Sequence, residues 1–146
     1  MNFKIINGPN LSALGRRERE HYGEINLPDL ERYTQAKLDN HSIKTSWFQS
    51  ECEGTLVNEI LSIDDAAFNG LIINPGALSH CSLALLDALE TVKVPVCECH
   101  LSQVHARGGI RQSLLTAKAA TMIMSGLKKE TYYIAAIALA ERILNA

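Results

Sequence analysis

The 146-residue sequence has no hydrophobic run long enough to span a bilayer. Its longest apolar stretch, residues 132–140, is about half of the roughly 18 residues that a membrane helix requires. The N-terminus lacks a charged segment followed by a longer apolar one, so we expect no secretory signal. These absences predict a cytoplasmic protein that does not act at a membrane.

An excess of charge of one sign is also missing. The 14 basic and 16 acidic side chains leave a net charge of −2, and both signs are spread along the chain. Without a basic stripe, nucleic acid is not an expected partner. The four cysteines lack the spacing of a disulfide framework, which agrees with a reduced, cytosolic protein. No glycine-rich phosphate-binding motif follows an expected strand, so nothing supports a dinucleotide or ATP site.

What the chain does contain is an alternation of short apolar runs with longer segments of helical spacing. The expected strands are residues 3–7, 44–49, 70–74, 94–100 and 119–125. Helices are expected from Pro28, around 56–63 and 83–89, briefly at 110–115, and over 129–144 with a face of Ile134, Ile137 and Leu144. This alternation predicts one α/β domain over residues 1–146, a doubly wound sandwich with a five-stranded parallel sheet buried on both sides.

Polar residues gather where three of the expected strands end, at residues 7–10, 74–80 and 98–103. Each stretch alone is compatible with ordinary turn chemistry, because Asn, Pro and Gly punctuate loops in any protein. In a doubly wound sheet, however, ligands bind beyond the carboxyl ends of the strands. Three polar stretches at one edge of the same sheet therefore favour a binding site there.

Glu98 and His100 are two residues apart on an expected strand, so their side chains point to the same face. A carboxylate at this spacing can fix the tautomer of an imidazole and favour its protonated form, which suits a general acid. A structural, half-buried histidine is the alternative. Cys97 and Cys99 fall on the opposite face and suit the core, which argues against a metal site that combines them with His100.

Two other segments combine arginines with polar residues. In the polar stretch 14–23, Tyr22 stands among arginines that would stabilise a phenolate, although an idle surface loop is the alternative. Arg107 and Arg111 flank a Gly-Gly pair, and at a helix start they would share one face able to hold an acid or hydroxyl groups. A solvated helix end is the alternative for this pair.

Together, these motifs resemble the type II 3-dehydroquinate dehydratases along nearly the whole chain. The motifs are Ile-Asn-Gly-Pro-Asn-Leu at 6–11, Leu-Gly-Arg-Arg at 14–17 with Tyr-Gly at 22–23, Gln-Ser at 49–50 with Glu-Gly at 53–54, Ile-Asn-Pro-Gly-Ala at 73–77 with Ser-His at 79–80 and Ser82, and Glu98 with His-Leu-Ser at 100–102, Arg107 and Arg111. The resemblance implies a flavodoxin-like fold, an enzyme without a cofactor or catalytic metal, and a homododecamer built as a tetramer of trimers.

The resemblance also implies a reaction, the anti elimination of water from 3-dehydroquinate through an enolate. This reaction serves the shikimate pathway to aromatic amino acids or the catabolism of quinate. By the resemblance, Tyr22 as tyrosinate removes the proton next to the ketone and Arg17 keeps that tyrosine ionised. Asn10 would bind a water molecule that stabilises the enolate oxygen.

His100, oriented by Glu98, would then protonate the departing hydroxyl group. The residues implied to bind the substrate are Asn74, His80, Asp87, Leu101, Ser102, Arg107 and Arg111. Among these, Leu101 and Ser102 would offer backbone N–H groups to the substrate carboxylate, and Asp87 would reach into the site of a neighbouring subunit.

The chain departs from the family's common pattern at Glu51, Cys81, Gln103 and the Gly108-Gly109 pair. Two glycines at a helix start cost roughly 1 kcal/mol each relative to alanine, so we expect Arg111 to be held less firmly. An active dehydratase is the leading hypothesis. A non-catalytic relative that binds a hydroxy acid is the alternative, and a flavin or phosphate binder is a third hypothesis without a phosphate-cradling loop to support it.

Overall fold

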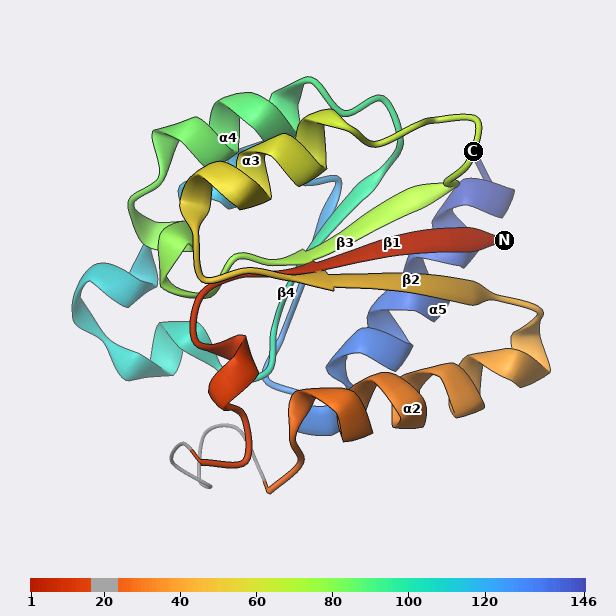
Figure 1. Ribbon diagram of the computed structural model, residues 1–146, viewed down its shortest axis with the longest axis horizontal. Helices are drawn as coiled ribbons and strands as arrows, with labels where there is room; N and C mark the ends of the chain where they lie inside the picture. Colours follow the sequence, from red (N-terminus) through yellow and green to blue (C-terminus); the bar gives the residue numbers. More distant parts are fainter. Residues whose placement is uncertain (17–23) are drawn as a thin grey trace.

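A five-stranded parallel sheet forms the middle layer of the molecule, and helices cover both of its faces (Figure 1). The computed structural model describes residues 1–16 and 24–146. The strands are β1 (Asn2–Asn7), β2 (Lys44–Gln49), β3 (Gly70–Asn74), β4 (Val96–His100) and β5 (Met122–Ser125). Their order, β2-β1-β3-β4-β5, is that of flavodoxin-like folds and confirms the predicted fold class.

Two of the described α-helices cover each face of the sheet. They are α2 (Leu27–Leu38) and α5 (Thr131–Leu144) on one face, and α3 (Glu53–Leu61) and α4 (Leu83–Glu90) on the other. Asn26 and Ser82 cap α2 and α4, because their side-chain oxygens accept backbone N–H bonds from the first turn. None of the helices within the described residues has the length and apolar character that a membrane crossing requires.

The sheet divides the core into two clusters, because successive strand residues point to opposite faces. In β1, Phe3 and Ile5 pack toward α2 and α5, whereas Ile6 packs toward α3 and α4. Strands β3 and β4 are buried along their whole length, while β2 and β5 at the edges are only partly buried or exposed. The expectation of strands buried on both sides therefore holds for the inner strands and is wrong for the two edge strands.

The connections diverge between β1 and β3. From β1 the chain passes to β2 on one side, and from β3 it passes through α4 to β4 on the other. The carboxyl ends of the strands lie at the end of the sheet opposite both chain termini (Figure 1). At this divergence, Gly8 lies so close to Pro75 that a Cβ atom on Gly8 would stand 2.4 Å from the Pro75 carbonyl oxygen. A glycine is thus required for the two loops to meet.

The prediction of a helix around residues 110–115 is wrong. The chain instead forms three short 3-10 turns, Val104–Arg107, Gly109–Gln112 and Thr116–Ala119. Ser113, in the middle of the predicted range, has extended backbone angles (φ −103°, ψ 125°), which end the turn and interrupt any helix there. A tertiary bond from the backbone N–H of Leu115 to the carbonyl oxygen of Ser79, at 2.7 Å, takes the place of a helical bond.

The buried face of α5 also differs from the predicted one. Leu144 is 69% exposed, and Ile134 and Ile137 are only partly buried. The fully buried positions are Thr131, Tyr132, Ala135, Ala136 and Leu139. The small side chains let α5 lie against β3, where a Cβ atom on Gly70 would stand 2.9 Å from Leu139 Cδ2. Close approach of the helix to the sheet, rather than hydrophobicity alone, selects this face.

We predict that Gly8→Ala destabilises the fold by about 1–3 kcal/mol, because the new methyl group must displace the Pro75 backbone and not a flexible side chain. Equilibrium urea denaturation measures the effect. Gly54→Ala in α3 is the matched control, since no heavy atom lies within 4 Å of a Cβ at that position. A Gly8→Ala variant as stable as the Gly54→Ala variant would contradict the close packing of the two loops.

Candidate active site

A pocket lies beyond the carboxyl ends of β1, β3 and β4. Its lining includes Asn10, Asn74, His80, His100, Leu101, Ser102, Arg107 and Arg111. These are all the predicted site residues that the structure describes, apart from Glu98 and Asp87. Glu98 is buried behind His100, whereas Asp87 is exposed on α4 and does not line this pocket. Arg17 and Tyr22 lie outside the described residues.

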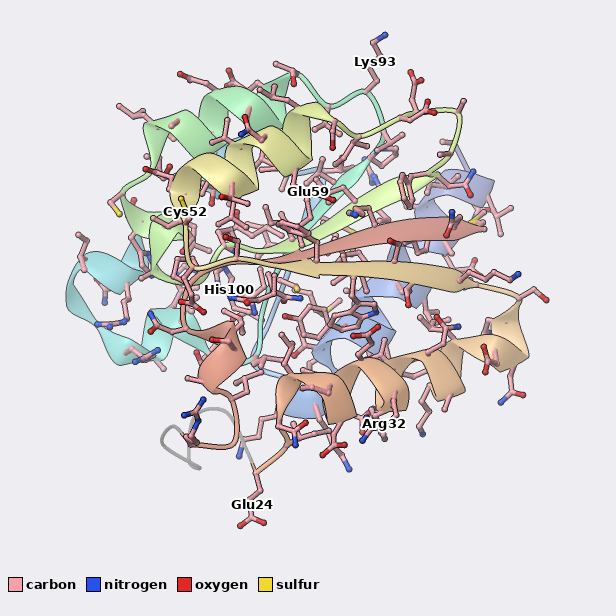
Figure 2. The ribbon with its side chains drawn as sticks, in the orientation of Figure 1. Glu24, Arg32, Cys52, Glu59, Lys93 and His100 are labelled. Atoms are coloured by element: carbon pink, nitrogen blue, oxygen red, sulfur yellow. The ribbon has the colours of Figure 1, made fainter. Side chains whose placement is uncertain are left out.

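The predicted pairing of Glu98 with His100 is confirmed. The two side chains share a face at the end of β4, with His100 Nε2 2.8 Å from Glu98 Oε1. Glu98 is 0% exposed and His100 4% exposed, so solvent hardly screens their interaction. In Figure 2, His100 lies at the end of the sheet from which the polar loops extend.

A residue that sequence reasoning missed completes this pair. The hydroxyl group of Thr116 donates a hydrogen bond to Glu98 Oε2 at 2.6 Å, so both carboxylate oxygens are engaged. Thr116 is fully buried in the 3-10 turn before β5, 18 residues after Glu98. No local signal marks it, because its role depends on how that turn packs beside β4. The carboxylate that holds His100 is therefore itself held in place.

Asn10 enters the pocket from an unusual backbone conformation. Its φ angle is +68°, and its backbone N–H donates to Glu51 Oε2 at 2.7 Å. Ser12 Oγ and Gln49 Nε2 donate to Glu51 Oε1 at 2.5 and 2.7 Å. The hydrogen bond from Ser12, followed by the one from Asn10, lowers the pKa of the Glu51 carboxyl group. Glu51, one of the positions at which the resemblance predicts a departure from the family's common pattern, thus supplies the carboxylate that anchors the Asn10 turn.

His80 and the two arginines come from segments far apart in the chain. His80 Nδ1 lies 2.8 Å from the carbonyl oxygen of Ser113, which ties the loop after β3 to the turns after β4. Arg107 and Arg111 stand on separate 3-10 turns, so the prediction of one shared helical face is wrong. Both nevertheless line the same pocket, because the turn through Gly108 folds the second segment back toward it.

Leu101 and Ser102 are buried where β4 ends. The carbonyl oxygen of Leu101 accepts the backbone N–H of Lys128 at 2.9 Å, and that of Ser102 accepts the Ser125 hydroxyl at 3.0 Å. These bonds to the end of β5 and the segment after it fix the backbone of both residues at the edge of the pocket.

Tyr132 of α5 combines a buried ring with a hydroxyl group that bonds to two asparagines at the strand ends. It accepts a hydrogen bond from Asn74 Nδ2 at 3.0 Å and donates one to Asn7 Oδ1. The sequence carries one signal for this role: a tyrosine shares a helix face with alanines. If that face is buried, the tyrosine hydroxyl group needs a hydrogen-bond partner.

The cysteines of β4 lie on the side of the sheet away from the histidine. Cys97 and Cys99 are buried in the cluster with α2 and α5, as predicted. Burial raises the pKa of the Cys97 thiol to about 12, with a smaller contribution from the charge of Glu98. Among residues 1–16 and 24–146, no group of His, Cys, Asp and Glu side chains is arranged to hold a metal ion.

These features place the chain among flavodoxin-like sandwiches that have a polar pocket at the divergence of two strands, the position at which this class binds small polar molecules. Comparison with known proteins narrows the class. The family described as dehydroquinase class II matches residues 1–140, and the chain belongs to this family. The predicted resemblance is thereby confirmed.

Individual relatives agree with the family. A 3-dehydroquinate dehydratase of Clostridium botulinum is 38% identical over 134 residues, which cover 92% of this chain and 90% of the relative. A 3-dehydroquinate dehydratase of Thermotoga neapolitana is 39% identical over 135 residues, which cover 92% of this chain and 91% of the relative. The crystal structure of the type II dehydroquinase from Butyrivibrio crossotus has a TM-score of 0.91 at 32% identity, and the match covers 96% of this chain and 97% of that one.

We predict that Thr116→Val lowers the free energy of unfolding by about 1–3 kcal/mol, because the buried Glu98 carboxylate loses one of its two bonded donors. Urea denaturation measures the change. Thr116→Ser retains a hydroxyl group and is expected to lie between the Thr116→Val variant and the unmodified chain. If Thr116→Val were as stable as the unmodified chain, the carboxylate would not depend on this hydrogen bond.

Proposed function

We propose that the chain catalyses the dehydration of 3-dehydroquinate to 3-dehydroshikimate, by anti elimination of water through an enolate. One observation carries the proposal. In a chain of the dehydroquinase class II family, the buried pair of His100 and Glu98 borders a pocket that also contains the side chains suited to a hydroxylated acid.

His100 is the general acid in this mechanism. Glu98, bonded to Nε2, fixes the orientation of the ring, so the proton to be delivered is carried on the other ring nitrogen, Nδ1. The hydroxyl bond from Thr116 keeps the carboxylate from turning away from the ring. The departing hydroxyl group of the substrate takes the proton and leaves as water.

Tyr22 is the proposed base, and Arg17 its stabiliser. A tyrosine with the ordinary pKa of about 10 is ionised to only about 0.1% at neutral pH, which corresponds to roughly 4 kcal/mol. A neighbouring guanidinium group and a site shielded from water supply much of that energy. In the sequence, both residues follow Asn10, a residue of the pocket lining, by 7 and 12 positions. Asn10 is proposed to bind the water molecule that stabilises the enolate oxygen.

The remaining pocket residues are proposed to hold the substrate. Its ring hydroxyl groups meet Asn74, His80 and Arg111, and its carboxylate meets the backbone N–H groups of Leu101 and Ser102. Arg107 adds a second positive charge at the same pocket. Two guanidinium groups and neutral donors complement one carboxylate and several hydroxyl groups, which is the functional-group set of this substrate.

The non-catalytic alternative rests on Gly108 and Gly109, and nothing in the described residues favours it. Both glycines adopt positive φ angles, and no heavy atom lies within 4 Å of a Cβ at either position. The pair therefore shapes the turn without occupying the pocket, and Arg111 still lines it. The expectation that Arg111 is held less firmly remains a prediction.

We also propose a single domain over residues 1–146 that assembles as a tetramer of trimers in the cytoplasm. The continuous sheet, covered by helices from both halves of the chain, supports the single domain. Asp87 is exposed on α4 and outside the pocket of its own chain, as a residue that completes a neighbour's site would be. The proposed cellular role is in the shikimate pathway or in quinate catabolism.

The test mixes purified protein with 3-dehydroquinate and follows the ultraviolet absorbance of the conjugated product. We expect turnover by the unmodified chain and a loss of about 10²–10⁴-fold in kcat for His100→Ala, the usual contribution of a general acid. Glu98→Gln is expected to fall between the two. His105→Ala is the matched control, because His105 is an exposed histidine that does not line the pocket.

Tyr22→Phe tests the base separately. Only the ionisable oxygen is removed, so we expect this variant to bind the substrate and not to turn it over. A folded, unmodified chain without turnover would overturn the proposed function. Normal turnover by Tyr22→Phe, or by His100→Ala, would leave the reaction in place and overturn the assignment of that residue.

A further inference from the structure

The hydroxyl group of Tyr132 lies directly behind the pocket, between the ends of two strands. The ring of Tyr132 is fully buried on α5 and tilts against Trp47 of β2, with ring centroids 5.0 Å apart. Asn7 and Asn74 are register partners at the ends of β1 and β3, and both side chains bond to this hydroxyl group. The fixed ring thus places one polar atom where the strands begin to diverge.

A backbone N–H group determines which atom donates and which accepts in each hydrogen bond of this network. The N–H of Gly76 donates to Asn74 Oδ1 at 3.2 Å, and a backbone N–H cannot accept. The amide oxygen of Asn74 therefore faces Gly76 and its nitrogen faces Tyr132, 3.0 Å away. Because the hydroxyl group accepts this bond, its single proton goes to Asn7 Oδ1.

Of the two N–H groups on Asn74 Nδ2, one donates to the Tyr132 hydroxyl group, which leaves the other for a different acceptor. Asn74 is also part of the pocket lining. We propose that Tyr132 is a positioning residue, which holds the Asn74 amide so that its second N–H is presented to a substrate hydroxyl group. The assignment rests on the proposed function, in which Asn74 contacts the ring hydroxyl groups. Tyr132 itself does not line the pocket.

One observation favours positioning over packing alone. Asn7 Nδ2 is buried and has no hydrogen-bond partner among the described residues, a cost that an apolar side chain would avoid. A network that carries such a cost is better explained by the orientation it imposes on Asn74.

The test is a double-mutant cycle read by ligand binding. Calorimetry gives the Kd of quinate, an unreactive polyhydroxy acid, for the unmodified chain, Tyr132→Phe, Asn74→Ala and the double variant. We expect Tyr132→Phe to raise Kd about 5- to 10-fold, the effect of one hydrogen bond. In the Asn74→Ala background, the same change should leave Kd unaltered, because the oriented group is already absent.

Kinetics with 3-dehydroquinate provides a second reading. Tyr132→Phe should raise KM by a similar factor and change kcat little, since Asn74 is proposed to hold a hydroxyl group throughout the reaction. Tyr133→Phe is the matched control from the same helix. Its ring lies 6.1 Å from that of His41 and also meets Lys37, at the surface of α2, so binding should not change.

The outcomes separate the two proposals. An equal loss of affinity in both backgrounds, or no loss in either, would overturn the positioning role of Tyr132 while the dehydratase remains. Failure of the unmodified chain to bind quinate and to turn over 3-dehydroquinate would overturn the proposed function, and the role of Tyr132 with it.

Discussion

The site depends on the divergence of β1 and β3 at their carboxyl ends. The two strands are paired up to Asn7 and Asn74, and directly beyond them the backbone of Gly8 rests on that of Pro75. This contact lies at the base of the space between the segment that follows β1 and the segment that follows β3. Any side chain at position 8 would force the two loops apart and displace the polar residues that follow these strands.

Because of this geometry, the pocket receives side chains from both faces of the sheet. Asn74 is held from the face covered by α2 and α5, through the hydroxyl group of Tyr132. His100 belongs to the other face, with Glu98 and Thr116 behind it. Asn74 and His100 are thus each supported by a buried partner on their own side of the sheet. Two independent supports allow an acid and a binding group to approach the same ligand from different directions.

Local sequence patterns were sufficient to predict the sheet, its class and the pairing of Glu98 with His100. The sheet and its class follow from the alternation of apolar runs with helical segments, and the pairing follows from the two-residue period of strands. Thr116 and Tyr132 were not predictable in this way. They meet Glu98 and Asn74 only through tertiary packing, 18 and 58 residues away in the chain. Residues 110–115 show a different limit: apolar spacing predicted a helix there, but the backbone is extended at Ser113 and Leu115 bonds to Ser79 instead.

In the proposed anti elimination, the acid and the base act on opposite faces of the substrate ring, and an isotope experiment can distinguish this from a syn elimination. The substrate is 3-dehydroquinate with deuterium next to the ketone, on the face opposite the departing hydroxyl group. We expect the 3-dehydroshikimate formed to have lost the deuterium, and the epimer labelled on the other face to retain it. Retention from the first substrate and loss from the second would show a syn elimination, and the proposed roles of Tyr22 and His100 would be wrong.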